Sequence, residues 1–452
     1  MSLRFVVMLL YVLGASGTAL FRPFWGLIGL VAMYYFRPDV WNQPDWFRPQ
    51  LWLTAAIGLG WVLQAKKIRL TPTMLVAFLA SGTLFIGSFT AAEDTATAYE
   101  GAVTVFKLVL VMFLTLNLVD TADRINTFLW ANVAGMLWNL KSIIVTGLRG
   151  GEVTEQRVDL GVGQGGGSNY IAMVLVAAIA FLWVRAQEGT ARERSAAKFL
   201  IPLHVLALIT TGSRAGFLAF GAVLLWMTAR SRKKFGAVIM AGLLGILFIV
   251  AVPDSFVDRF RSGVGGDGNR DGSAQSRILL WKGAVTMFLE RPITGVGMDN
   301  YALMSPRYVG FYASRSYTPY EPGVKGPGFV THSTWFQTLA EGGILTAVPY
   351  FLMFAMAWFA TVRIKASKVI GPAADSLRAN ATAMQGILIA IVLTSSFGSH
   401  MKIDFLWWYV GLISAMSLAI DKERLAERER VRRIAAARPE PLAPVTAGVG
   451  SA

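Results

Sequence analysis

The histidines are the first side chains to consider for acid–base chemistry, because the chain has only three of them and no cysteine. His332 opens a long apolar run, and we expect it in the first turn of a helix. There the positive end of the helix dipole would disfavour protonation and leave a neutral imidazole able to accept a proton. The alternative is a histidine that only caps the helix. His400, at the end of another apolar run, is the reserve base, whereas His204 lies inside an apolar run and is expected to hydrogen-bond there.

Arg214 lies in a polar turn, residues 210–216, between two apolar runs. A guanidinium group is suited to forked hydrogen bonds with a phosphate. The turn is expected outside the cytoplasm, where a basic residue is less common. We therefore expect Arg214 to bind a phosphate; the alternative is an arginine that only snorkels towards lipid phosphates.

The segment 253–335 is the longest stretch between apolar runs. Residues 273–290 place apolar side chains at helical spacing, which predicts an amphipathic helix at the membrane interface. Pro292 ends this helix, and residues 295–301 predict a tight turn into a second short helix. Basic and aromatic residues alternate here, which suits a sugar-phosphate ligand; the alternative is an interfacial aromatic belt. They are Arg277, Arg307, Arg315, Lys325, Tyr301, Tyr308, Phe311, Tyr312, Tyr317 and Tyr320.

Most of the chain cannot face water, since 54% of its residues are hydrophobic and 15% are charged. Apolar runs of about 15 to 22 residues recur, each near the length of a helix that crosses a bilayer. They lack the alternation of an outer-membrane barrel, so we predict an all-α polytopic membrane protein with about 12 transmembrane helices. The first two runs are either two crossings or one broken crossing. The runs are 3–20, 23–36, 50–65, 72–91, 99–119, 122–147, 167–185, 199–212, 213–230, 234–252, 336–363, 380–399 and 404–420.

Basic residues between the runs determine the expected orientation, because basic loops stay in the cytoplasm. Four short basic loops and the tail then lie inside, and the long loop lies in the periplasm of a bacterial inner (cytoplasmic) membrane. The loop would carry short interfacial helices and the catalytic elements. The predicted organisation is an N-terminal transmembrane bundle (1–252), the periplasmic loop (253–335), C-terminal transmembrane helices (336–420) and a basic, partly disordered cytoplasmic tail (421–452).

Composition and spacing exclude several other classes. The net charge of +15 is spread over short runs between apolar segments, so we expect membrane lipids and no nucleic acid as partners. The lack of cysteine excludes disulfides and thiolate metal sites. Residues 267–272 fit the first half of a calcium loop, but Ile278 stands where a bidentate glutamate is needed. We expect neither a metal nor a cofactor.

Several short motifs together resemble the signature of the O-antigen ligase and polymerase superfamily. They span about residues 205–345, whereas the flanking runs match only in pattern. The motifs are Thr211-x-Ser213-Arg214-x-Gly216, Gln275-x-Arg277 with Trp281, Pro292 with Gly295-Val296-Gly297, His332-Ser333 and Glu341-Gly342-Gly343. The segments 21–23 and 34–38 are also similar to the exosortase-associated O-glycosylation ligase branch.

The resemblance implies an inverting, metal-independent glycosyltransferase that moves a glycan from undecaprenyl diphosphate to lipid A-core oligosaccharide. His332 would take the proton of the acceptor hydroxyl, and Arg214 and Arg277 would neutralise the departing diphosphate. The remaining expected substrate contacts are Ser213, Gln275, Trp281 and Tyr301.

Glu341 is a second reserve residue, and its part is open. It follows His332 by nine positions, so on one straight helix it would face the opposite side. It therefore either takes part in the site or helps to hold the long loop.

Rival functions remain open. An O-antigen polymerase or a protein O-glycosylation ligase would share this architecture and chemistry and differ only in the acceptor. A transporter would need charged or unwound sites near the membrane midplane, where Lys107 and Lys141 are the only obvious cations. A structural scaffold for other envelope enzymes is a further alternative.

Overall fold

The computed structural model describes residues 3–36, 46–64, 67–90, 92–148, 167–231, 233–251, 272–309, 311–313, 316–318 and 328–436. Helices dominate this part of the chain, with one two-stranded antiparallel hairpin, in which Tyr312 pairs with Tyr317. The elements are α1 (Leu3–Phe21), α2 (Pro23–Phe36), α3 (Pro49–Leu63), α4 (Pro72–Thr90), α5 (Thr95–Leu118), α6 (Ala122–Leu148), α7 (Ser168–Glu188), α8 (Ala191–Thr210), α9 (Arg214–Arg230), α10 (Lys234–Ala251), α12 (Gly272–Glu290), α13 (Asn300–Val309), β1 (Phe311–Ala313), β2 (Ser316–Thr318), α14 (Thr334–Lys365), α15 (Pro372–Ser395) and α16 (Asp404–Ala436).

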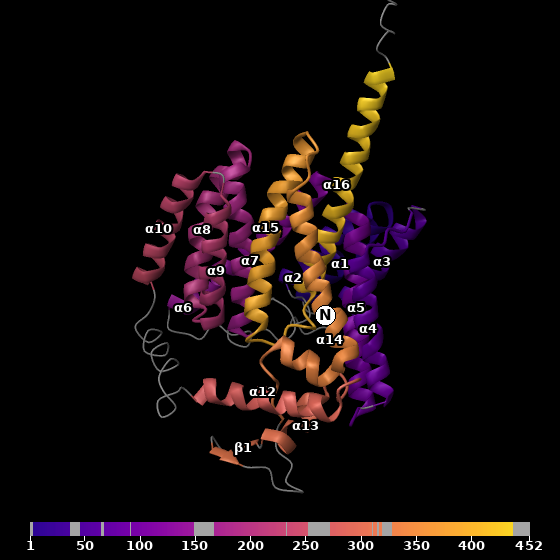
Figure 1. Cartoon of the computed structure of the whole chain (residues 1–452), viewed down its shortest axis with the longest axis vertical. Helices are drawn as coiled ribbons and strands as arrows, with labels where there is room; N and C mark the ends of the chain where they lie inside the picture. The colour runs from indigo at the N-terminus through magenta and orange to yellow at the C-terminus, as the bar shows by residue number, and fades with distance from the viewer. Residues whose placement is uncertain are drawn as a thin grey trace, which may run out of the picture.

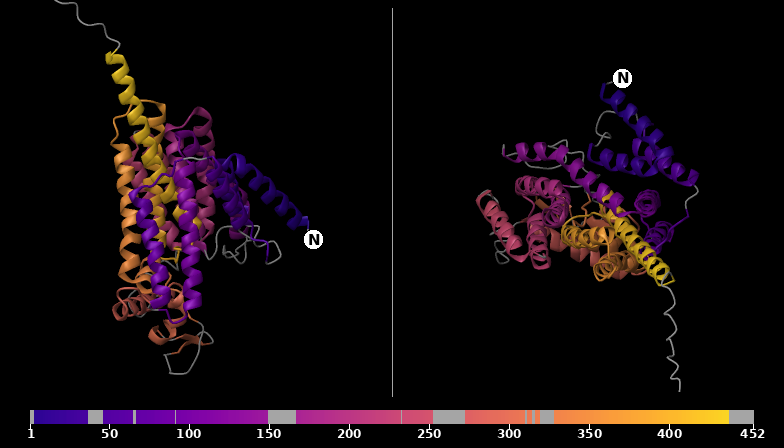
Figure 2. Two further views of the ribbon diagram at one scale, coloured as in Figure 1. Left: turned by 90° about the vertical axis from the view of Figure 1, so that its right-hand side faces the viewer. Right: turned by 90° about the horizontal axis from the view of Figure 1, so that it is seen from above.

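The long helices form one bundle, with α7 near its centre (Figure 1). Helix α7 is apolar on all sides and nearly every residue in it is buried, because α8, α9 and α15 pack around it. A second group, in which α4, α5, α14 and α16 pack in pairs, completes the bundle. The N-terminal helices α1, α2 and α3 lie at one side, and α16 extends past the bundle at the end opposite to α12 (Figure 2).

Helix α12 lies across one end of the bundle, and α13 and the hairpin lie beyond it (Figure 1). We call this the α12 end. A small core separate from the main one joins α12 and α13 to the first turns of α14. Its buried members are Leu280, Ala284, Met287, Val296, Tyr301, Met304, Val309 and Ala340. The helix expected over residues 273–290 and the short second helix that follows it are therefore confirmed as helices.

The turn between α12 and α13 is docked on α14. Gly295 (φ 66°) and Gly297 (φ 88°) adopt left-handed conformations that favour glycine. A β-carbon on Gly295 would lie 2.5 Å from the carbonyl carbon of Glu341. The amides of Val296 and Gly297 donate to carbonyls of α14, which itself bends at Gly343 (φ 56°). The glycines thus permit the close approach that fixes α12 and α13 on the bundle.

Each of the thirteen apolar runs overlaps a helix, so the helical class is confirmed. Helices α8 and α15 begin eight residues before the predicted runs, and α16 continues 16 residues beyond its run. Six helices in the described part of the chain, α4, α5, α6, α7, α14 and α15, are long and apolar enough to cross a membrane. Helices α1, α2, α3 and α10 are apolar but shorter. The number of about twelve crossings and the periplasmic side of the long loop stay predictions.

Candidate functional site

His332 immediately precedes α14 at the α12 end, and its backbone is left-handed (φ 50°). Residues other than glycine rarely adopt this conformation, although histidine does so more often than most. The N-cap of α14 is Ser333 and the helix begins at Thr334. The expectation that His332 occupies the first helical turn is therefore wrong, and the residue lies just outside the helix with an exposed side chain.

Neighbouring side chains hold His332 in this conformation. The Thr331 hydroxyl donates to the Ser333 carbonyl (2.9 Å) and accepts from the Ser333 amide (3.3 Å), so that it spans His332. The indole N–H of Trp281 in α12 donates to the Thr331 carbonyl (3.1 Å), and the indole stacks on Phe336 of α14. A rare backbone conformation persists only where several contacts support it, and such positions gather at functional sites.

Two effects hold the pKa of His332 below its usual value. Loss of hydration against the surrounding chain is the larger effect, although part of the ring stays exposed, and the positive charge of Arg277 is the smaller one. Both disfavour the imidazolium form. A neutral imidazole is thus favoured, as expected, but the causes are desolvation and the charge of Arg277 in α12, and not a place in the first turn of α14.

The loop between α15 and α16, residues 396–403, connects the parts of the site, and we call it the bridging loop. The Thr334 hydroxyl donates to the Gly398 carbonyl (2.8 Å) and accepts from the His400 amide (2.8 Å). The Trp335 indole N–H donates to the Ser396 hydroxyl (3.0 Å). The first turn of α14, and with it the residue before the helix, is therefore fastened to the bridging loop.

Arg214 is the first residue of α9, and the N-cap Ser213 connects it to the bridging loop. The Ser213 hydroxyl donates to the side-chain carbonyl of Asn169, at the start of α7 (2.7 Å). The Asn169 side-chain amide donates to the Phe397 carbonyl (2.8 Å). The Phe397 ring in turn lies 6.3 Å from the Trp281 ring, centroid to centroid. A continuous chain of contacts therefore joins the start of α9 to α12.

His400, the reserve base, is only 2% exposed. Its Nδ1 lies 3.3 Å from the Ser395 hydroxyl, and its ring packs near Tyr170. Burial lowers its pKa to about 4. A group enclosed in this way is less accessible to a sugar hydroxyl than the exposed His332, and its contacts fit a part in holding the bridging loop.

Tyr301 and Glu341 lie together in the small core, on the α13 side of the site. The Tyr301 hydroxyl donates to the Leu280 carbonyl (2.7 Å), and burial raises its pKa. The Glu341 carboxylate accepts from the Gln337 side-chain amide (2.9 Å) and from the Tyr301 backbone amide (3.2 Å). Glu341 was expected either to take part in the site or to help hold the long loop, and these contacts fit the second role. Tyr301 joins the same packing.

The structure thus places His332 near Arg277 and Trp281, and it connects Ser213 to Trp281 through Asn169 and Phe397. Glu341 instead contacts the backbone of Tyr301 in α13. The side chain of Gln275 lies outside the described part, as do residues 267–271 and Arg315, Tyr320 and Lys325. Sequence reasoning missed the connecting residues Asn169 and Phe397, and it gave no role to Thr331 and Thr334, which flank His332 in the sequence. The polar residues Ser395, Ser396, Ser399 and His400, at the end of the apolar run 380–399, were an available signal for the bridging loop.

The arrangement joins an exposed neutral imidazole to a cationic neighbourhood at one end of a helical bundle. It can accept a proton from a hydroxyl group and stabilise an anion that leaves nearby. No group of three or more histidine, aspartate or glutamate side chains within the described ranges is placed to hold a metal ion.

Comparison with known proteins bears on the same residues. No curated protein matches the chain. A family model described as O-antigen ligase matches residues 199–351, a range that includes Arg214, Arg277 and His332 but not His400. The apolar helices and this match identify a membrane-integral protein. The match over residues 199–351 supports the O-antigen ligase superfamily, as the motifs of the sequence indicate.

Proposed function

We propose that the protein is an O-antigen ligase that transfers a glycan from undecaprenyl diphosphate to lipid A-core oligosaccharide in the periplasm. The observation that carries the proposal is the placement of His332 beside Arg277 and Trp281, inside the region that matches the family. The α12 end would face the periplasm of the inner membrane, because the basic tail of α16 extends from the opposite end.

In the proposed reaction His332 accepts the proton of the acceptor hydroxyl. The hydroxyl oxygen then attacks the anomeric carbon of the donor from the face opposite to the diphosphate. The new carbon–oxygen bond forms as the bond to the diphosphate oxygen breaks, and the leaving group departs with the electron pair. One displacement of this kind inverts the anomeric configuration. An exposed, neutral imidazole suits the first step, because only the neutral form accepts a proton.

Arg214 and Arg277 would stabilise the charge that develops on the departing diphosphate. They come from α9 and α12, which the Asn169 and Phe397 contacts hold in a fixed relation. Fixed donors are effective because they need little reorganisation during the reaction. Ser213 supports this arrangement as the N-cap of α9, and Trp281 supports it through its bond to Thr331.

Deletion of the gene for this protein in its host distinguishes a ligase from a polymerase. We expect full-length glycan to accumulate on undecaprenyl diphosphate, because polymerisation continues while the transfer to lipid A-core stops. Extraction of lipid-linked glycans and their separation by length measures this. Accumulation of single repeat units would instead identify a polymerase, and a modified protein that loses its glycan would identify a protein O-glycosylation ligase.

Transfer by the purified protein is expected to continue in excess EDTA. The reason is that the arginines, and not a divalent cation, are proposed to neutralise the diphosphate. The measurement is the rate of glycan transfer in detergent with and without the chelator, from metal-free donor. A loss of activity that magnesium or calcium restores would disprove the metal-independent mechanism and direct attention to residues 267–278.

A further inference from the structure

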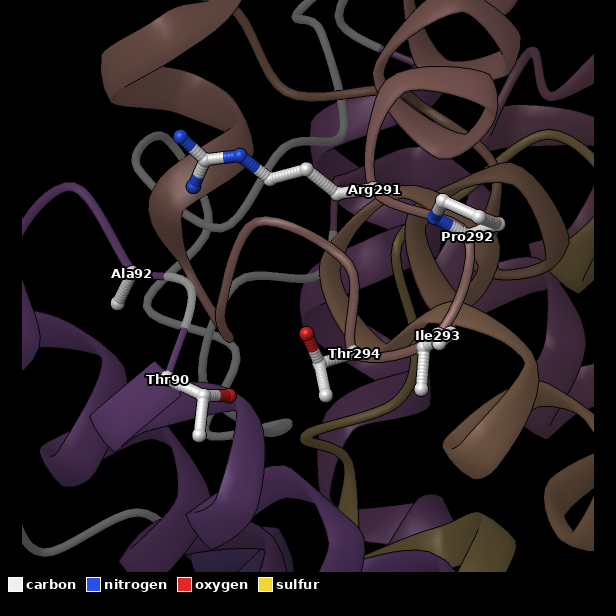
Figure 3. Close-up of a pocket in the computed structure, with 6 residues that line it drawn as sticks. All are labelled: Thr90, Ala92, Arg291, Pro292, Ile293 and Thr294. Carbon is white, nitrogen blue, oxygen red and sulfur yellow. The ribbon is translucent and has the colours of Figure 1, made fainter.

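A cavity of about 490 Å³ opens at the α12 end, apart from the residues around His332. It lies between the end of α4 and the turn that follows α12 (Figure 3). The residues that line it are Thr90, Ala92, Arg291, Pro292, Ile293 and Thr294.

The walls of this cavity are held in place by backbone contacts. The amides of Ile344 and Leu345 in α14 donate to the carbonyls of Pro292 (2.8 Å) and Ile293 (3.1 Å). On the other wall, a β-carbon added to Gly87 of α4 would lie 2.9 Å from the Thr294 carbonyl oxygen. The turn and α4 are thus in close contact, and this contact fixes the two sides of the cavity relative to each other.

Among the described residues that line the cavity, Arg291 is the one with a charge. Its side chain extends across the cavity from the turn towards Ala92, with the Thr294 hydroxyl below it (Figure 3). A guanidinium and a hydroxyl group are both donors, and together they suit the oxygen atoms of a phosphate. The cavity therefore favours an anionic group.

An apolar surface leads to the cavity along α4. Leu75, Leu79, Ile86 and Phe89 are 54%, 58%, 48% and 68% exposed, and their spacing puts them on one face of the helix. Ile293, in the lining itself, is 60% exposed. Since α4 is one of the helices able to cross a membrane, this face is suited to hydrocarbon chains.

We propose that the cavity binds the phosphate of a lipid headgroup, with an acyl chain of the same lipid along the exposed face of α4. A free phosphate would use only Arg291 and Thr294, whereas a lipid would use the cavity and the apolar face together. The proposal requires that the protein is embedded in a membrane and does not depend on the glycan transfer reaction.

Binding of a defined lipid to the purified, delipidated full-length protein tests the proposal. The probe is dimyristoyl phosphatidylglycerol, titrated in detergent and followed by native mass spectrometry. We expect Arg291→Ala to weaken binding by about tenfold, as the loss of a charged hydrogen bond predicts. The lipid affinity of Arg291→Lys should lie between those of the wild type and Arg291→Ala, because lysine keeps the charge but loses the paired N–H donors of the guanidinium group.

Lys282→Ala is the matched control, because it removes one positive charge from the exposed side of α12, the helix that ends just before Arg291. It should bind the lipid like the wild type. Ile86→Ser tests the apolar face independently and should also weaken binding. Equal affinities for Arg291→Ala and the wild type, or equal losses in Arg291→Ala and Lys282→Ala, would overturn the proposal. Inorganic phosphate that binds as tightly as the lipid would overturn the assignment to a lipid. A thermal melt of each variant separates lost binding from lost folding.

Discussion

Replacement of His332 by asparagine is expected to lower the rate of glycan transfer by about 10²- to 10⁴-fold, the usual contribution of a general base. Asparagine tolerates the left-handed conformation that His332 adopts, so the turn before α14 should persist. It cannot accept the proton of a hydroxyl group. The measurement is transfer from purified lipid-linked donor, normalised to folded protein, with donor binding determined in parallel and expected to change little.

The pH dependence of the wild type should report the same group. Because only neutral His332 accepts a proton, the rate should rise with pH through the pKa of this residue. Burial and Arg277 lower that pKa, so the acid limb should lie below the ordinary histidine value of about 6.5. The limb should be absent from the residual rate of the asparagine variant.

His400→Asn serves as the comparison for this experiment. We expect its effect on transfer to be smaller, and to come with reduced thermal stability, since the residue is buried in the bridging loop. Wild-type turnover in His332→Asn would remove His332 from the mechanism. Loss of the acid limb in His400→Asn alone would transfer the role of base to that residue.

Removal of Arg214 or Arg277 is the second change with a large expected effect. Alanine at either position should raise the barrier by roughly 2 to 4 kcal/mol, as judged from the loss of one oxyanion donor in other enzymes. Lysine keeps the charge but loses the paired donors, so it should retain part of the activity. The measurement is the transfer rate for each variant at saturating acceptor.

The double alanine variant distinguishes shared from separate action. If Arg214 and Arg277 bind one diphosphate, the loss of activity in the double variant should be well below the sum of the losses in the two single variants, expressed as changes in the barrier. Arg307→Ala is the matched control, because Arg307 is also basic and at the α12 end but pairs with Glu93 (2.5 Å). It should transfer at a nearly normal rate. Full activity in either single alanine variant, or strictly additive losses, would show that the two arginines do not share a diphosphate.

Arg277 has a further measurable consequence. Its positive charge lowers the pKa of His332, so its removal should move the acid limb of the pH profile upward. Removal of Arg214, whose charge is not among the causes of that shift, should leave the limb in place. This difference separates the effect of Arg277 on the base from its effect on the leaving group.

The sequence by itself determined the helices, and with them the positions at which polar residues interrupt apolar runs. This was possible because apolar spacing and capping act within a few neighbouring residues, as in α12 and in the turn before α9. The same local patterns identified His332, Arg214 and Arg277 as candidates. The match over residues 199–351 agrees with that choice of region.

Only the tertiary structure decided how these residues meet. The left-handed backbone of His332 depends on Trp281, 50 positions before Thr331, and the link from α9 to the bridging loop depends on Asn169, 228 positions before Phe397. Glu341 reaches the Tyr301 amide of α13 because Gly295 and Gly343 let two segments approach closely, which the spacing along one straight helix does not reveal. Contacts of this kind arise from packing between distant segments, and local periodicity carries no information about which segments will touch.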